Sequence, residues 1–434
     1  MKKQLLTSTD SFEKLIEGHY YNPGRRRFLK HSLIGGVSLL CLPLCAKRPK
    51  ELSYMLGLDS PAHYFDGEKC WVHPRAGIVP GAGLNGMSRV VMTMNTLDLA
   101  GSDVFKGMYG MHTGDWGEHW TEITEQMLLK PRLMTIEGEV SPVAVSDFWP
   151  KWHRASGTLL GIGHSVVYNS EWRVVAKRPR DTVYSCYDPK TDQWAGPQNL
   201  VMPDPVKFYN AGAGCVQRYD QPDGAILLPV YFSLTGDSHY VTVLKCSFDG
   251  RTLQYISNGD ELTLDDGTRG LYEPSLTCFD GEYFLTLRHD KQGFVTKSRD
   301  GMHFSPVQSW QFDDGSDLGN YNTQQHWVTH NEGLFLVYTR RGANNDHVFR
   351  HRAPLFIAQV NPETMQVIRS TEKILVPERG ARLGNFGVTD ISPDETWVTV
   401  AEWMQPKGCE KYGSDGSLFI ARIRWNQPNK LFVS

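Results

Sequence analysis

The side chains best suited to chemistry lie between residues 320 and 352. This stretch contains Asn320-Tyr-Asn-Thr-Gln-Gln-His326, Tyr338-Thr-Arg-Arg-Gly-Ala-Asn-Asn-Asp-His347 and Phe349-Arg-His-Arg352. A solvated surface usually carries Lys and Glu, but this stretch has no Lys and one Glu. An arginine guanidinium group can donate two parallel hydrogen bonds to one carboxylate or sulfate group, and Asn, Gln and His can bind sugar hydroxyls. We therefore predict a ligand site here; the alternative is a loop network that stabilises the fold. The candidate ligand contacts are Gln325, His326, Arg341, Asn344, Arg350 and Arg352.

A second polar set contains two histidines. His153 ends the run Phe148-Trp-Pro-Lys-Trp-His153, and His164 ends Gly161-Ile-Gly-His164 eleven residues later. We expect a strand, a turn at Ser156-Gly157 and a return strand, which would bring the two imidazoles together. Neighbouring imidazoles can act as a base and its partner or bind a metal ion. Each alone is equally explained as a half-buried histidine with satisfied hydrogen bonds.

A repeated turn indicates the elements that would position these residues. Thr113-Gly-Asp-Trp-Gly, Ser247-Phe-Asp-Gly and Ser298-Arg-Asp-Gly share an Asp two residues after Ser or Thr, then Gly and an apolar anchor. The Asp carboxylate can accept hydrogen bonds from backbone amides, while Gly takes the positive-φ position. Related turns stand at Asp188, Asn361 and Ser392. This chemistry is typical of β-hairpins.

The spacing of these turns predicts the fold class. From about residue 85 onward, short runs of β-branched and aromatic residues alternate with turn residues. The turn positions Asp115, Asp188, Asp249, Asp300 and Asn361 are 51 to 73 residues apart. That period suits a four-stranded blade with one long loop. We predict an all-β chain forming a six-bladed β-propeller, with seven blades as an alternative. A β-sandwich is the competing fold, and it would not explain the repeat.

The turns resemble the Asp-box of sialidase-like β-propellers. The order Glu273-Pro-Ser, then Arg288, then Ser298 resembles one active-site blade of the sialidases. The resemblance spans the architecture of about residues 85–425 and is most specific at 273–304. It implies an exo-glycosidase acting on a carboxylated glycan. In that family three arginines bind the substrate carboxylate, a Glu activates a Tyr nucleophile, and an Asp is the acid/base.

The resemblance assigns these roles to residues of this chain. Glu273 matches the activating Glu and Arg288 the second arginine, while Arg89 takes the place of the first arginine and Asp103 that of the acid/base. Alternatives stay open for the other two roles. The third arginine is Arg341, Arg350 or Arg352, and the nucleophile is Tyr412 or Tyr338.

Propeller polysaccharide lyases are a competing family. They resemble this chain in combining His and Tyr with Arg: arginine neutralises a uronate carboxylate, and His or Tyr removes the neighbouring C–H proton. A non-catalytic glycan-binding propeller is the third interpretation, because a fold alone never implies activity. The residues that could fill the lyase roles are His153, His164, Tyr209, Arg218 and His326.

The first 46 residues resemble a twin-arginine export signal. Arg25-Arg26-Arg27-Phe28-Leu29-Lys30 has the form Arg-Arg-x-Phe-Leu-Lys and precedes an apolar run at 32–44, which is too short and too rich in Gly to cross a bilayer comfortably. We expect a signal peptide at 1–46, a lead-in segment at 47–84 and the catalytic propeller at 85–434. The protein would be periplasmic or secreted, without an integral membrane span in the mature chain. Lipid anchoring at Cys41 or Cys45 is the alternative.

Composition limits the partners. Without residues 1–46, 38 Lys and Arg face 45 Asp and Glu, a formal net charge of −7, and no basic run could follow a nucleic-acid backbone. We expect no nucleic-acid partner, no cofactor and no metal site, since no Cys-x-x-Cys pair occurs. The six remaining cysteines are expected as free thiols. A monomer that binds an anionic oligo- or polysaccharide is the expectation that follows.

Overall fold

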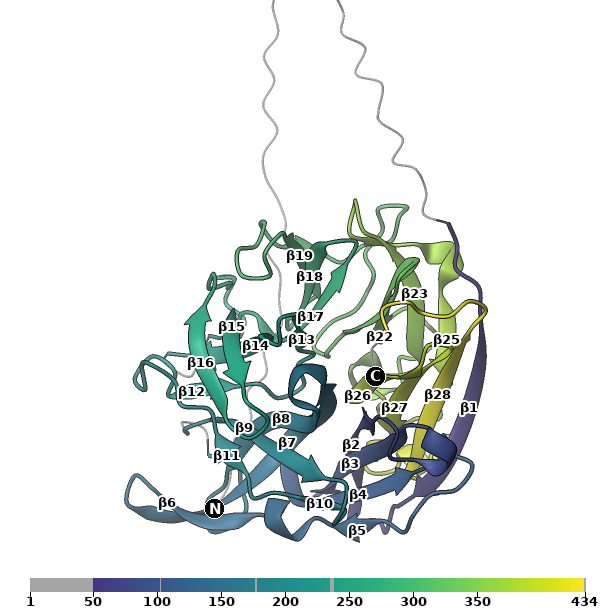
Figure 1. Ribbon diagram of the computed structural model, residues 1–434. Helices are drawn as coiled ribbons and strands as arrows, with labels where there is room; N and C mark the ends of the chain where they lie inside the picture. Colours follow the sequence, from purple (N-terminus) through teal and green to yellow (C-terminus); the bar gives the residue numbers. More distant parts are fainter. Residues whose placement is uncertain (1–49, 102, 176–177, 235–237, 433–434) are drawn as a thin grey trace, which may run out of the picture. The chain divides into compact units, whose positions relative to one another are not determined.

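The structure is a computed structural model that describes residues 50–101, 103–175, 178–234 and 238–432. These residues form a six-bladed β-propeller, which confirms the predicted fold class (Figure 1). Each blade is an antiparallel sheet of four to six strands. The export signal expected at 1–46 lies outside the described residues.

The first three blades follow one another along the chain. Blade 1 contains β2 (Lys69–Val79), β3 (Arg89–Asp98), β4 (Val104–Thr113) and β5 (Thr124–Glu125). Blade 2 contains β6 (Arg132–Ile136), β7 (Glu139–His153), β8 (Thr158–Val167), β9 (Thr182–Asp188), β10 (Gln193–Trp194) and β11 (Gln198–Asn199). Blade 3 contains β12 (Asn210–Gly212), β13 (Tyr219–Asp220), β14 (Ile226–Ser233), β15 (Tyr240–Phe248) and β16 (Leu253–Asn258).

The remaining blades complete the ring. Blade 4 contains β17 (Tyr272–Phe279), β18 (Glu282–Arg288), β19 (Phe294–Ser298) and β20 (Gln308–Ser309). Blade 5 contains β21 (His326–His330), β22 (Gly333–Tyr338), β23 (Leu355–Asn361), β24 (Gln366–Val367) and β25 (Lys373–Val376). Blade 6 contains β26 (Phe386–Ser392), β27 (Glu395–Ala401), β28 (Ser417–Trp425) and β1 (Tyr54–His63).

Strand β1 closes the ring by joining the last blade. It pairs antiparallel with β28, and Figure 1 shows the purple β1 beside the yellow β28. Tyr54 anchors it: this side chain is 7% exposed, and its ring lies 5.5 Å from Trp425 and 5.6 Å from Phe335 of blade 5. The segment 47–84 is therefore not a lead-in, since it holds β1 and β2. Pairing the two ends of the chain removes a free sheet edge.

The repeated turns occupy one position in the first five blades. The turns at Asp115, Asp188, Asp249, Asp300 and Asn361 each lead to the outer strand of the sheet: they join β4 to β5, β9 to β10, β15 to β16, β19 to β20 and β23 to β24. Their predicted hydrogen bonding is confirmed: Asp300 Oδ1 accepts bonds from the Met302 and His303 amides, both at 2.8 Å. The Ser392 turn instead joins β26 to β27. Blade 6 takes its outer strand from β1, so it has no third-to-fourth turn.

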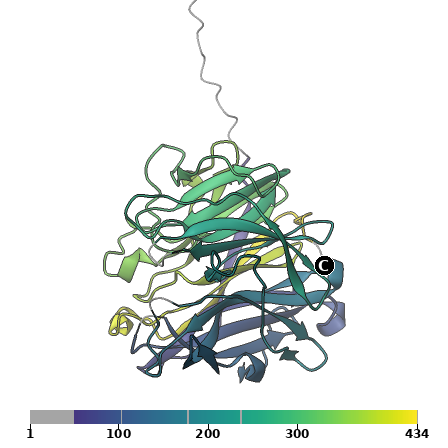
Figure 2. The same cartoon turned by 90° about the vertical axis from the view of Figure 1, so that its left-hand side faces the viewer.

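Aromatic side chains pack the blades against one another. Trp310, which follows β20, lies 5.7 Å from Trp327 of blade 5, and both are fully buried. Trp120 of blade 1 packs 6.0 Å from Trp397 of blade 6. The inner strands also contact their neighbours, for example β2 with β7 and β26. Figure 2 shows these sheets from the side. The propeller thus holds its inner strands rigidly around the axis.

Helical structure in the described residues is limited to 3₁₀ turns. They are η1 (Leu84–Gly86), η2 (Met127–Leu129), η3 (Arg154–Ser156), η4 (Phe349–His351), η5 (Arg369–Thr371) and η6 (Cys409–Tyr412). Within the described ranges, no helix has the length and apolar character needed to cross a membrane. The six cysteines in these ranges are free, as expected.

Candidate active site on the propeller axis

Five blades present a left-handed residue at or just before the inner strand. His73, Asp147, Cys215, Glu273 and Asn322 have φ values between 45° and 58°. In blades 1, 2 and 4 the residue sits in a β-bulge, where the register with the second strand shifts. A bulge redirects a side chain that regular alternation would send elsewhere. The five residues and their direct partners form two clusters of contacting side chains, one around Asp147 and one around Glu273.

Asp147 is the centre of the first cluster. Its Oδ1 accepts a hydrogen bond from Arg75 Nη1 at 3.1 Å and one from the Cys215 thiol at 2.6 Å. His73 Nε2 lies 3.3 Å from Oδ1, and His164 Nε2 lies 3.4 Å from Oδ2. Burial alone would raise the pKa of Asp147, but His73, His164 and Arg75 hold it well below its usual range. Asp147 is therefore a fully engaged carboxylate.

His164 connects Asp147 to Tyr231. The Tyr231 hydroxyl lies 3.3 Å from His164 Nδ1, on the other side of the ring from Asp147. Burial lowers the pKa of His164 and raises that of Tyr231. A neutral imidazole that donates from Nε2 to Asp147 leaves Nδ1 to accept from the phenol. The Tyr231 hydroxyl can therefore donate a hydrogen bond to His164, whereas the two pKa shifts oppose transfer of its proton.

Glu273 and Arg288 form the second cluster. Arg288 Nη1 lies 2.6 Å from both Glu273 carboxylate oxygens, and Nη2 donates to Asn322 Oδ1 at 2.6 Å. Burial would lower the pKa of Arg288, but the Glu273 charge raises it. The Arg288 guanidinium also lies 4.7 Å from the ring centre of Tyr272. Strand β17 supplies Glu273 and β18 supplies Arg288, so one hairpin fixes the pair.

Three further arginines surround this pair, and none of them has an acidic partner among the described residues. Burial lowers the pKa of Arg350, Arg352 and Arg382, in the last case to about 10, and neighbouring guanidinium groups lower each pKa further. The Asp103 carboxylate acts in the opposite direction on Arg350 and Arg382, which places it in the same region.

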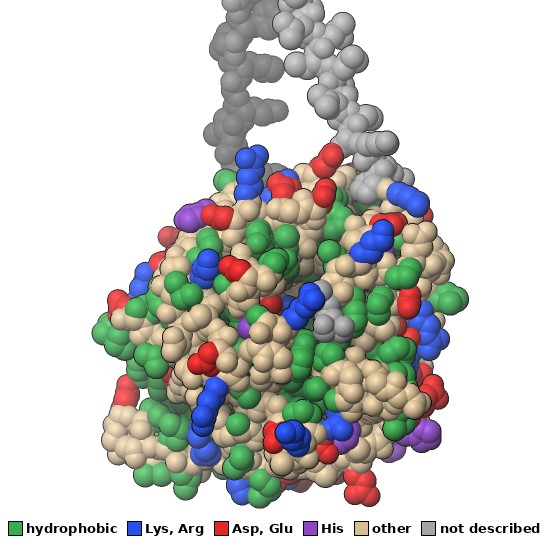
Figure 3. All heavy atoms as spheres, viewed as in Figure 1, with side chains coloured by type: hydrophobic (Ala, Val, Ile, Leu, Met, Phe, Trp, Pro, Cys, Tyr) green, Lys and Arg blue, Asp and Glu red, His purple; other side chains and the backbone are tan. Residues whose placement is uncertain are grey.

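The arginine set is short of hydrogen-bond acceptors. The Nε atoms of Arg288, Arg352 and Arg382 are buried and have no partner among the described residues. We call Arg288, Arg350, Arg352 and Arg382 the axial arginines. In the described part of the chain their one ion pair is Arg288 with Glu273. Figure 3 shows basic and acidic side chains interspersed over the visible face, without a large patch of one sign. Unneutralised guanidinium groups that are partly desolvated form a site for an anion.

The structure therefore brings together five of the sequence candidates. Glu273, Arg288, Arg350, Arg352 and Asp103 lie in one electrostatic network, and His164 joins the adjoining Asp147 cluster. Reasoning from the sequence did not select Arg75, Asp147, Tyr231 or Arg382. One signal was present: a polar residue interrupts an otherwise apolar or aromatic run at His73, Asp147 and Glu273.

The two histidines expected to meet do not. The turn forms at residues 154–157 as predicted, but His153 pairs with Thr158 beside it, while His164 pairs with Ser146 at the far end of the hairpin. His153 binds the Ser156 hydroxyl and the Gly224 carbonyl instead. The expected pairing is wrong because the turn is centred too close to His153.

Other candidates are held by partners elsewhere in the fold. These are Arg89 (ion pair with Asp192), Arg341 (ion pair with Asp317), Arg218 (ion pair with Asp220), Tyr338 (hydrogen bond to Glu372) and Tyr209 (hydrogen bond to Glu137). Gln325 and His326 are buried, where they bind Thr286 and Ser275. Asn344 is exposed, and Tyr412 is 44% exposed against the His347 ring. No tyrosine hydroxyl in the described residues is hydrogen-bonded to Glu273.

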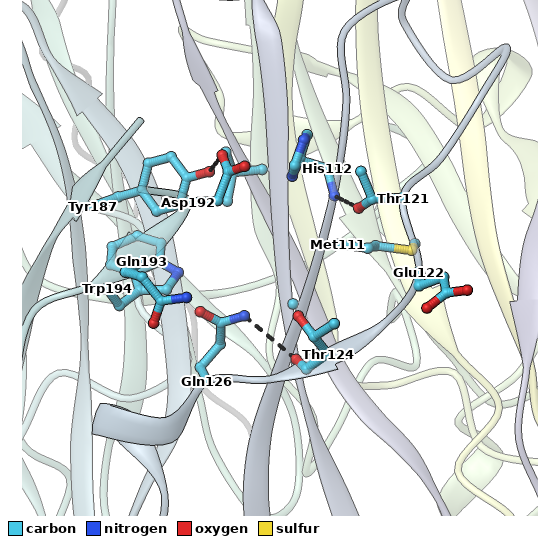
Figure 4. Close-up of a pocket in the computed structure, with 12 residues that line it drawn as sticks. Met111, His112, Thr121, Glu122, Thr124, Gln126, Tyr187, Asp192, Gln193 and Trp194 are labelled. Carbon is cyan, nitrogen blue, oxygen red and sulfur yellow. Dashed lines mark hydrogen bonds between the residues drawn. The ribbon is translucent and has the colours of Figure 1, made fainter. Parts of the chain in front are cut away.

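A separate groove of about 260 Å³ lies between blades 1 and 2. Figure 4 shows side chains of blade 2 on one side of it (Tyr187, Asp192, Trp194) and those of blade 1 on the other (His112, Thr121, Thr124). The groove shares no residue with the axial clusters. Arg89 is bound to Asp192 at this groove, which explains its absence from the axis.

The burial of His73 predicts a pH dependence of stability. Burial lowers the pKa of this residue from 6.5 to about 4. An unfolded chain therefore binds more protons than the folded one between these values, and stability falls as the pH falls through that window. We expect the contribution of neutral His73, about 3 kcal/mol at 1.4 kcal/mol per unit, to be complete above pH 6.5 and lost toward pH 4. Urea unfolding at pH 7 and pH 4.5 measures it.

Two variants separate His73 from other groups. His239, whose pKa burial also lowers to about 4, adds to the same slope. His73→Asn should therefore flatten the pH dependence in part. His63→Asn is the control, because that residue is exposed at the end of β1 and its replacement should leave the slope unchanged. A slope that His73→Asn does not alter would assign the titration to another group.

Comparison with known proteins supports the architecture. No family model matches this chain, and no curated protein is similar to it. A protein of unknown function from Dyadobacter fermentans DSM 18053 superposes with a TM-score of 0.54 at 13% identity, covering 85% of this chain and 99% of that one. Trypanosoma rangeli sialidase in complex with the inhibitor DANA gives 0.54 at 14% identity, covering 82% and 55%.

A Hadza microbial sialidase is similar to the same extent. Its TM-score is 0.53 at 12% identity, covering 84% of this chain and 66% of that one. The present chain thus spans about half of the Trypanosoma rangeli enzyme chain and less than two thirds of the Hadza one. At these identities the likeness concerns architecture, and it shows that this chain has a sialidase-like propeller fold.

Proposed function

We propose that this protein is an exported carbohydrate-active enzyme that binds a carboxylated sugar on the propeller axis and hydrolyses its glycosidic bond, as a sialidase-like exo-glycosidase. One observation carries the proposal. Of the four axial arginines, one, Arg288, forms an ion pair within the described residues. Three of their Nε atoms are buried and have no hydrogen-bond partner there. A carboxylate would supply the missing acceptors and the missing charge.

The roles follow from the positions of the charges. Arg352 and Arg382 bind the substrate carboxylate, while Arg288 fixes Glu273 beside it. Asp103, which acts electrostatically on Arg350 and Arg382, protonates the leaving oxygen. Glu273 orients the attacking water, since no tyrosine hydroxyl in the described residues bonds to it. Tyr412 and Tyr338 have no part in this proposal.

A uronate lyase is the second candidate, and a specific observation favours it. His164 lies between Asp147 and the Tyr231 hydroxyl, with ring nitrogens 3.4 Å and 3.3 Å from them. In this candidate the axial arginines neutralise a uronate carboxylate, and Tyr231 removes the C–H proton next to it after passing its own proton to His164. Sialidase chemistry has no use for this His and Tyr pair.

The remaining parts of the proposal concern location. A twin-arginine signal at 1–46 would direct the folded chain to the periplasm or the medium, and residues 47–434 would then act as the mature enzyme. We propose that it works as a monomer, because all six blades, including the one closed by β1, come from one chain.

Binding of acidic sugars tests the axial site directly. We expect the protein to bind at least one of N-acetylneuraminic, glucuronic and galacturonic acids in a calorimetric titration, and not galactose. Arg352→Gln should weaken that binding about 10- to 100-fold, because a charge-assisted hydrogen bond is worth about 1.5–3 kcal/mol.

Arg341→Gln is the matched control. Arg341 lies in the same segment but is ion-paired with Asp317 away from the axis, so its loss should leave binding unchanged. Equal losses in the two variants, or none in Arg352→Gln, would contradict the axial site. Release of reducing sugar without a conjugated double bond indicates a hydrolase, and absorbance of that double bond indicates a lyase. Binding without either product would leave a glycan-binding propeller.

A further inference from the structure

Two arginines outside the axial set are also left without acidic partners. Arg178 and Arg180 lie between β8 and β9, at the junction of blades 2 and 3, and both are half-buried. Within the described residues neither forms an ion pair. The one side-chain hydrogen bond that joins them to another described residue is from Arg178 Nη1 to the Val175 carbonyl at 3.1 Å. None of the roles proposed above involves them.

The backbone fixes this pair against blade 3. The Arg180 amide donates to the Tyr209 carbonyl at 3.1 Å, and the Arg180 carbonyl accepts from the Ala211 amide at 2.9 Å. Asn210 Nδ2 donates to the Arg178 carbonyl at 2.9 Å. These contacts hold both residues at the start of β12, so the arginines are presented by a rigid element.

The Arg180 side chain lies in a space prepared for it. Gly212 has no Cβ, and one placed there would come within 2.5 Å of Arg180 Cδ. The guanidinium group then covers Tyr231, with its carbon 4.7 Å from the ring centre. A cation over an aromatic face is favourable, but it satisfies none of the guanidinium N–H donors.

The donors of this pair are left unused. Arg178 Nε and Arg180 Nε and Nη1 are buried and have no partner among the described residues. Burial, followed by the charge of Arg180, lowers the pKa of Arg178 to about 10. Two adjacent guanidinium groups repel each other, and buried N–H groups without acceptors are unfavourable. An anion bound between them would relieve both effects.

Two acidic groups in this region do not neutralise the pair. Asp147 is already engaged by Arg75, His73, His164 and Cys215. Asp103 acts to raise the pKa of Arg178, but burial and the charge of Arg180 outweigh it. The pair therefore calls for an acceptor from outside the chain.

Two aromatic rings separate this pair from the axial arginines. Arg180 lies over Tyr231, Tyr231 is 6.4 Å from Tyr272, and Arg288 lies over Tyr272 at 4.7 Å. Arg178 and Arg180 belong to the blade 2 and 3 side of the ring, whereas the axial arginines belong to blades 4 to 6. A ligand that reaches both sets must extend past these two rings.

We propose that Arg178 and Arg180 form a second anion subsite, so that the ligand carries two acidic groups. One is the carboxylate at the axial arginines. The other is a sulfate ester on the same sugar or a carboxylate on the next sugar. This inference rests on the proposed function, because it takes the axial carboxylate site as given. It narrows the substrate to a doubly acidic saccharide.

Titrations with matched probes test the subsite. We use glucuronic acid, glucuronic acid 2-sulfate, a galacturonic acid disaccharide and inorganic sulfate. The wild-type protein should bind at least one doubly acidic probe about tenfold or more tightly than the monosaccharide with one carboxylate. The sulfated probe and the disaccharide distinguish the two sources of the second charge. The double variant Arg178→Gln/Arg180→Gln should lose this preference but keep its affinity for glucuronic acid.

Two further variants keep the test interpretable. Arg180→Lys retains the charge and should keep part of the preference, which a purely structural role of Arg180 would not explain. Arg173→Gln is the control, because this residue of the same loop is exposed and paired with Glu171. Urea unfolding midpoints check that each variant folds.

The outcomes separate this inference from the proposed function. If glucuronic acid binds but the second charge adds nothing, the subsite is wrong and the axial site stands. If no sugar binds, the axial proposal fails, and inorganic sulfate decides on the subsite alone. Sulfate binding that the double variant loses supports the subsite; absence of sulfate binding to the wild-type protein overturns it.

Discussion

Replacing Asp147 by Ala is expected to lower the free energy of unfolding by about 3–5 kcal/mol, the usual cost of removing one partner from a buried ion pair. Arg75 is 0% exposed and would keep its charge without the carboxylate. The Cys215 thiol would lose its acceptor, and the histidines on either side would lose theirs. The loss is read from urea unfolding curves at pH 7.

An exposed carboxylate provides the control. Asp346 also contacts a histidine, His351, at 3.2 Å, but its side chain is 96% exposed, so Asp346→Ala should cost less than about 1 kcal/mol. A second variant, Arg75→Met with Asp147→Asn, removes both charges and should restore part of the stability. If Asp147→Ala were as mild as Asp346→Ala, the Asp147 cluster could not be what holds the inner strands of blades 1 to 3 together.

The fold could be predicted because its signals are local. A turn such as Ser298-Arg-Asp-Gly forms its hydrogen bonds within a few residues, so its chemistry is visible in the chain itself. Repeating that turn at a blade-like period then implies the array. Blade 6 broke the pattern because its outer strand, β1, comes from the other end of the chain. No local signal marks a strand whose partner lies more than 350 residues away.

The site was harder to predict from the sequence than the fold, because β-bulges and burial determine which side chains reach it. Strict alternation in β7 would not single out Asp147, which stands beside Phe148 and Trp149 in a run of apolar residues. The left-handed backbone at this residue redirects the strand, and nothing in the sequence requires it there. Arg75 is likewise a buried arginine inside a strand, a placement that sequence patterns disfavour.

Among the candidates suggested by resemblance, those whose expected partner lies in the same hairpin were predicted correctly, and those that depended on distant strands were not. Glu273 and Arg288 occupy neighbouring strands of one hairpin, so their spacing in the chain fixed their meeting in space. Arg89 and Tyr338 lie on strands of other blades and are bound by partners away from the axis. Arg89 forms an ion pair with Asp192, and Tyr338 donates a hydrogen bond to Glu372. Density of Arg and His near residue 350 indicated the right region, although Arg341 and Asn344 lie at its exposed rim.

Replacing Glu273 by Gln is expected to reduce hydrolysis of a bound acidic glycoside by about 10²–10⁴-fold, the range by which a positioned acid or base accelerates proton transfer. Gln keeps the shape of the side chain, but it cannot take a proton from the attacking water. Binding should fall less than turnover, because the axial arginines that hold the substrate carboxylate remain. The measurement is kcat and KM on the glycoside that the wild-type protein cleaves.

Tyr231→Phe decides between the two chemistries, because hydrolysis and elimination place proton transfer in different clusters. If the reaction is hydrolysis, loss of the Tyr231 hydroxyl should change kcat by no more than a few fold. If it is elimination, Tyr231→Phe should lose the activity and Glu273→Gln should not, since the proton then passes through His164. Glu282→Gln is the control within blade 4, where Glu282 forms a half-exposed ion pair with Lys297. Full hydrolytic turnover by Glu273→Gln would exclude Glu273 from the chemistry and leave it as the counter-ion of Arg288.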